Sequence, residues 1–170
     1  TWNIPKILEL PEGRNVTGYH IRKAMSYEIA QGSGGDTHFL SDYGCVVFRG
    51  VEAMLNYMEA CYEKNSNLDA TAESYWKAIR TRAGVDPDFN KTIAATDYTK
   101  EDDWAIYSAG QPVDKTLYNI RRERMAETFS EGLRYTDLLR WRSFDNMLSD
   151  KWIPEGVNFW DGMYRNYMVD

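Results

Sequence analysis

Apolar side chains between Val47 and about Lys64 recur at steps of three and four residues, the spacing of one face of an α-helix. A second stripe follows Asp69, a residue type that caps helix starts. It ends before Gly84, which suits the left-handed conformation beyond a helix end. Because only a short turn separates the two stripes, the pattern predicts an antiparallel helix pair over residues 47–84.

The same periodicity returns toward the carboxyl end of the chain. It predicts a second helix pair over residues 113–148, with individual helices at about 114–130 and 133–148. Gly132 is the expected break between them, because glycine is a weak helix former.

A long connection, residues 85–112, separates the two helix pairs. Within it, Thr99–Asp102 has the Ser/Thr-x-x-Asp/Glu form of a helix start. This motif predicts a short helix from about Lys100 to Tyr107.

The two ends of the chain lack helical periodicity. Residues 1–46 are expected to be irregular, with short strand-compatible pieces separated by proline and glycine. Residues 149–170 combine many aromatic side chains with proline and glycine, which predicts an extended tail. The expected fold is therefore mainly α: tetratricopeptide-like antiparallel helix pairs between an irregular N-terminal segment and an aromatic-rich C-terminal tail.

Composition narrows the functional classes. The chain has 170 residues and a formal net charge of −6, which argues against a nucleic-acid-binding protein. Its longest strictly apolar run, Cys45–Phe48, is far shorter than the ~20 residues of a membrane-spanning helix. Cys45 and Cys61 are expected to be separate thiols. Because the chain begins at Thr1 without a signal segment, we expect any targeting information to lie upstream.

Ten charged residues lie between Arg121 and Arg142, and they allow two interpretations. Arginines and acids at helical spacing favour a lattice of ion pairs between packed helices. The alternative is a helical glycoside hydrolase with Glu123 and Asp137 as general acid and base, which requires the two carboxyl groups to face each other across a cleft. We favour the lattice and predict no catalytic residues.

Metal and cofactor chemistry have little support in the sequence. The two histidines, His20 and His38, are not in a zinc-binding or triad motif, and we predict no metal and no cofactor. Two acidic stretches, Asp86–Asn90 and Asp97–Asp103, lack the spacing of a hand-type calcium loop. Caps and turns explain them more simply.

Aromatic residues in the long connection are the best ligand-binding candidates. Tyr98, Trp104 and Tyr107 lie among aspartates and asparagines. An aromatic face covers the apolar side of a sugar ring while amides and carboxylates take its hydroxyls. The alternative interpretation is that these rings only hold the connection against the helices.

Four segments in series resemble the SusD/RagB family of outer-membrane nutrient-binding lipoproteins. Gly18–Lys23 is similar to its Gly-Tyr-x-x-Arg-Lys strand, and Phe48–Ala60 to its Arg-Tyr-Ala-Glu-x-Leu-Leu-Asn-Tyr-Ala-Glu-Ala helix. Ile79–Gly84 resembles Ile-Arg-x-Arg-Ala-Gly. The most specific segment, Ile120–Trp141, is similar to Glu-Arg-Arg-x-Glu-Leu-x-Phe-Glu-Gly-x-Arg-x-x-Asp-Leu-x-Arg-Trp.

The resemblance implies that residues 1–170 are one piece of a larger, mostly helical binding protein. Such a protein captures oligosaccharide at the cell surface and presents it to a SusC-like TonB-dependent transporter in the outer membrane. Its membrane attachment would be a lipid anchor upstream of this chain. The positions that match the family motifs are expected to be scaffold: Arg49, Glu52, Arg82, Gly84, Arg122, Glu123, Glu127, Glu131, Gly132, Arg134, Asp137, Arg140 and Trp141.

A further alternative is that the chain is a helical docking module, or a peptide-binding member, for the same class of transporter. Oligosaccharide binding would separate it from the first interpretation.

Overall fold

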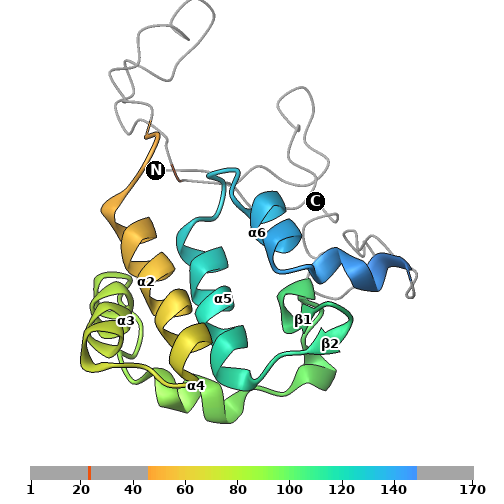
Figure 1. The fold of residues 1–170 in the computed structure, drawn as a ribbon. Coiled ribbons are helices and arrows are strands. Elements are labelled where there is room, and N and C mark those ends of the chain that lie inside the picture. The colour runs from red at the N-terminus through yellow and green to blue at the C-terminus, as the bar shows by residue number, and fades with distance from the viewer. Residues whose placement is uncertain (1–22, 24–45, 149–170) are drawn as a thin grey trace, which may run out of the picture. The chain divides into compact units, whose positions relative to one another are not determined.

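The computed structural model describes Lys23 and residues 46–148 of the chain (Figure 1). The predicted short strands, the predicted aromatic tail and Cys45 lie outside the described residues. Everything below therefore concerns residues 46–148. Within them the structure is mainly helical, which confirms the predicted mainly α class.

The first predicted helix pair is present as α2, Gly50–Asn65, and α3, Ala70–Arg82 (Figure 1). As predicted, Asp69 caps α3, and its side chain accepts a hydrogen bond from the Ala72 backbone N–H at 2.7 Å. Gly84 has φ +73°, the left-handed conformation expected after the helix. α2 begins three residues later than Val47 because the backbone before it is extended.

The long connection contains more structure than the sequence predicted. α4, Phe89–Ala95, was missed, although Asp88 caps it by accepting from the Asn90 N–H. Two 3-10 turns follow, η2, Tyr98–Lys100, and η3, Trp104–Ile106. Two short strands, β1, Tyr107–Ser108, and β2, Gln111–Pro112, then pair antiparallel.

The continuous helix predicted from Lys100 to Tyr107 is therefore wrong. Asp97 accepts a hydrogen bond from the Thr99 N–H, and Asp103 accepts one from the Ala105 N–H. Each carboxylate thus starts its own short turn, and the backbone is extended at Glu101, between the two turns. Local side-chain bonds of this kind compete with a continuous helix.

The second predicted pair is also shorter than expected. It consists of α5, Lys115–Glu127, and α6, Arg134–Arg140, followed by the 3-10 helix η4, Ser143–Leu148. Gly132, at φ +79°, lies in the break between α5 and α6, as predicted. The second helix does not continue to residue 148, because Arg142 takes a positive φ and its carbonyl accepts from the Ala109 N–H.

Among the described residues, α2 and α5 lie side by side and antiparallel, and α3 packs against α2 (Figure 1). The larger core cluster joins α2, α3, α4 and α5, and it contains Leu55, Met58, Cys61, Ala72, Trp76, Ile79, Phe89 and Ile120. A smaller cluster joins the long connection to α5 and the end of α6, and it contains Ala105, Ile106, Tyr118 and Trp141. Arg121 of α5 lies against Trp141 of the smaller cluster, and Glu123 of α5 accepts a hydrogen bond from Trp76 of the larger one.

Candidate functional site

Glu59 is the centre of a buried ion-pair network between α2 and the end of α6. Its side chain faces the core and is only 4% exposed. Its carboxylate oxygens lie 2.7 and 2.6 Å from Nη1 and Nη2 of Arg140, a two-pronged ion pair, and accept a further bond from the indole N–H of Trp141. Burial by itself would lower the pKa of Arg140. The bonds to Glu59 outweigh this effect, and the pKa of Arg140 lies above its ordinary value.

Asp137 extends this network from α6 to α5. Its two carboxylate oxygens accept from Nε of Arg124 at 2.7 Å and from Nε of Arg140 at 2.9 Å. Arg124 is buried and also donates to the Asn56 side chain on α2 at 2.7 Å. We call Glu59, Arg124, Asp137, Arg140 and Trp141 the Glu59 network. It joins three helices through three buried charged groups, Glu59, Arg124 and Asp137, and the partly exposed Arg140.

Arg121 links α5 to the long connection. This buried guanidinium donates to the carbonyls of Ala105 and Tyr107, at 3.1 and 3.3 Å, and to the Ser108 hydroxyl at 2.9 Å. It also lies 4.7 Å from the centre of the Trp141 ring. Burial lowers the pKa of Arg121, because the charged form is withdrawn from water.

A second group of ion pairs joins the start of α2 to the ends of α3 and α5. Arg49 lies 2.7 Å from a Glu127 carboxylate oxygen and 2.7 Å from one of Glu131. Arg82 pairs with the other oxygen of Glu127. Farther along α5, Glu123 accepts from Trp76 and Arg80 of α3 at 2.8 and 2.9 Å.

Both acids of the hydrolase interpretation are therefore engaged with cations. Glu123 is held by an indole and a guanidinium, and Asp137 is held by two guanidiniums. A general acid must present its carboxyl group to a substrate, whereas both carboxylates here are occupied by bonds to neighbouring side chains. The geometry of these pairs favours an ion-pair lattice over an acid–base pair.

The three aromatic ligand candidates lie in different surroundings. Tyr98 packs edge-on against Tyr118, and its hydroxyl donates to the Val113 carbonyl at 2.8 Å, so its polar group is already used. Burial raises the pKa of Tyr98 to about 12. Tyr107 is half-buried on β1, where its carbonyl accepts from Arg121.

Trp104 is half-buried at one end of a row of three rings. Its ring contacts that of Phe144 edge-on at 5.7 Å between centroids, and Phe144 contacts Tyr135 at 5.6 Å. We call Trp104, Phe144 and Tyr135 the aromatic row. It brings together η3, η4 and α6, which no sequence pattern placed side by side.

Sequence reasoning missed several residues at these sites. Glu59 follows Met58 and lies four residues after Leu55, so a charged side chain sits on the buried face of α2. That break in an apolar stripe was a readable indication of a buried ion pair. No comparable pattern pointed to Phe144 or Tyr135.

The acidic stretches considered as cation sites are engaged with other groups. Asp86 accepts from Lys91 at 2.8 Å, and this hydrogen bond holds the pKa of Asp86 below its ordinary value. Asp103 pairs with Arg134. Among residues 23 and 46–148 no group of three or more acidic, histidine or cysteine side chains is arranged to hold a metal ion.

Within the same residues no helix combines the length and apolarity needed to cross a bilayer. A family model described as the SusD family matches residues 6–167. The searches of curated proteins and of solved structures return no match to this chain. The family match includes all of residues 46–148 and hence both groups of ion pairs.

Proposed function

The chain belongs to the SusD family, and from this premise we propose that it captures an oligosaccharide and hands it to a SusC-like TonB-dependent transporter. Family membership carries this proposal. Proteins of the family are in general glycan-binding proteins of nutrient uptake, typically without catalysis, and are outer-membrane surface lipoproteins. We further propose that this protein is held at that surface by a lipid anchor.

Trp104 is the residue that we propose as a ligand contact. Its ring is half-buried, so it is held in place while part of it faces solvent. Of the three candidates, Tyr98 has its hydroxyl bonded to a backbone carbonyl, and Tyr107 is part of the chain segment whose backbone Arg121 binds. We therefore propose that Tyr98 and Tyr107 hold the long connection that carries Trp104 in place.

Isothermal calorimetry with a panel of oligosaccharides tests this function. The intact protein is expected to bind at least one neutral oligosaccharide, and Trp104→Ala is expected to weaken that binding. Tyr57→Ala is a matched control, because Tyr57 is an exposed aromatic residue on α2. Unchanged affinity in Trp104→Ala would remove Trp104 from the site.

A docking module for the transporter is the second candidate. It is favoured by large apolar side chains that remain exposed at Val46, Val47, Phe48, Phe129 and Leu139. Such exposure is typical of surfaces that contact another protein. If no oligosaccharide in the panel produced heat while the purified transporter still bound, docking alone would be the better description.

A further inference from the structure

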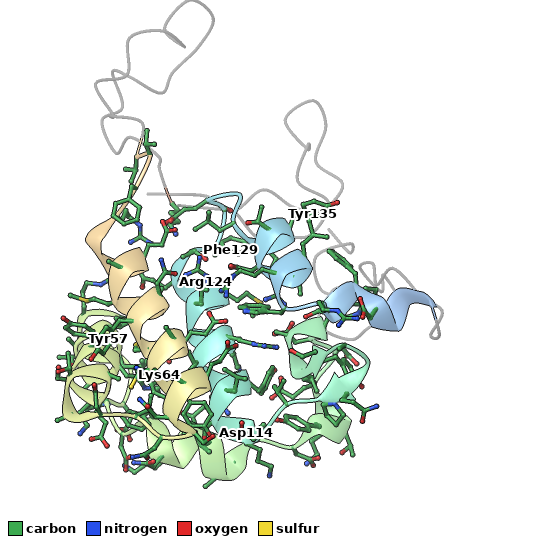
Figure 2. The ribbon with its side chains drawn as sticks, viewed as in Figure 1. Tyr57, Lys64, Asp114, Arg124, Phe129 and Tyr135 are labelled. Atoms are coloured by element: carbon green, nitrogen blue, oxygen red, sulfur yellow. The ribbon has the colours of Figure 1, made fainter. Side chains whose placement is uncertain are left out.

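Tyr135 is unusually exposed for a residue held in an aromatic cluster. It lies on α6 (Figure 2). Its surface is 65% accessible, whereas its neighbours Phe144 and Trp104 are half-buried. The two ring contacts, 5.6 and 5.7 Å between centroids, link the exposed ring to two fixed ones. The row therefore presents an aromatic surface whose position is determined by three separate elements.

An ion pair with unused hydrogen-bonding capacity is formed by the residues that directly precede Tyr135 and Trp104 in the sequence. Arg134, directly before Tyr135, pairs through Nη2 with Oδ1 of Asp103, directly before Trp104. Within the described part of the chain, two further atoms of this pair, Nη1 of Arg134 and Oδ2 of Asp103, are buried and have no hydrogen-bond partner. One free donor and one free acceptor thus accompany the aromatic surface.

Resting on the glycan-binding function proposed above, we propose that the aromatic row stacks against pyranose rings of a neutral oligosaccharide. The Arg134–Asp103 pair then hydrogen-bonds neighbouring hydroxyl groups. A sugar hydroxyl both donates and accepts, so adjacent hydroxyls satisfy Asp103 Oδ2 and Arg134 Nη1 together. Both atoms are covered in the free protein; in the proposed complex, rotation of the partly exposed Arg134 side chain uncovers Asp103 Oδ2 and turns Arg134 Nη1 toward the ligand.

The charges near the row favour an uncharged ligand. Arg134 pairs with Asp103, and Arg142 pairs with Asp145 at 2.6 Å, so neither of these two cations is unpaired and available to an acidic sugar. Asp102 is exposed beside Trp104. An apolar protein segment fits less well, because it offers no hydroxyl groups to the unpartnered donor and acceptor.

The test is affinity of the intact protein for neutral hexasaccharides of glucose, mannose and xylose, with an oligogalacturonide as the acidic comparison. Tyr135→Ala is expected to weaken binding of the best neutral ligand at least about tenfold, because the stacked surface is lost. Tyr135→Phe keeps the ring and is expected to stay within about twofold. Asp103→Asn is expected to weaken binding, because a carboxylate acceptor is lost.

Tyr57→Ala is the matched control, since it removes an exposed tyrosine on α2, away from Tyr135 (Figure 2). Circular dichroism of each variant separates lost binding from lost folding. Neutral binding that Tyr135→Ala leaves intact would overturn this inference while the proposed function stands. A preference for the acidic oligosaccharide would also overturn it, and no binding of any probe would overturn both.

Discussion

Replacing Glu59 with alanine removes the acceptor at the centre of the Glu59 network. Two groups are affected directly. The Trp141 indole N–H stays buried without its partner, which costs about 1–3 kcal/mol. Arg140 loses two charged hydrogen bonds, but its side chain is 44% exposed and regains water, so we assign that loss about 1–2 kcal/mol.

The sum, about 2–5 kcal/mol, agrees with the cost of breaking a buried ion pair from one side. For a chain of this size, about 3 kcal/mol corresponds to a Tm lower by about 6–12 °C. Urea unfolding monitored by circular dichroism measures the loss of free energy, and calorimetry measures the Tm. The same experiments apply to the control variant.

Glu63→Ala is that control, because Glu63 lies one turn later on the same helix with its side chain 51% exposed. Its carboxylate is 3.7 Å from Arg121, and its removal is expected to cost at most about 1 kcal/mol. The reasoning is refuted if Glu59→Ala is no more destabilised than Glu63→Ala. A Glu59→Gln variant that retained full stability would also show that the charge is unimportant.

Three further outcomes are expected. Gly132→Ala should lower the free energy of unfolding, measured in urea, by about 1–2 kcal/mol, because φ is +79°. The cost should not be larger, because among residues 46–148 no atom beyond the two adjoining residues lies within 4 Å of the added methyl group. Burial raises the pKa of Tyr98 to about 12 and also raises that of Tyr118, from ordinary values of 10.0. The stability that these two raised pKa values contribute is complete below about pH 10 and is lost as the pH rises toward 12. The urea midpoint of unfolding should therefore fall between about pH 10 and 12, and it should fall less steeply in Tyr98→Phe. In a Cys45→Ser background, buried Cys61 should react with a thiol reagent slowly when folded and rapidly in urea; equal rates would contradict its burial.

The sequence by itself determined where most helices lie and how several of them start and end. Apolar periodicity located α2, α3 and α5, and single residues such as Asp69, Gly84 and Gly132 marked boundaries that the structure confirms. These are local properties, because caps and left-handed residues act within one helical turn. Where two local preferences competed, as between Asp97 and Asp103, the prediction of a single helix failed.

Only the tertiary structure decided which charges and rings meet. Glu59 and Arg140 are 81 residues apart in the sequence, and Trp104 and Tyr135 each contact Phe144. The residue types of Arg121–Arg142 indicated ion pairs, but a periodic pattern carries no information on partners from another helix. Partners are set by how α2, α5 and α6 pack, because a buried charge must find an opposite charge within a few ångströms.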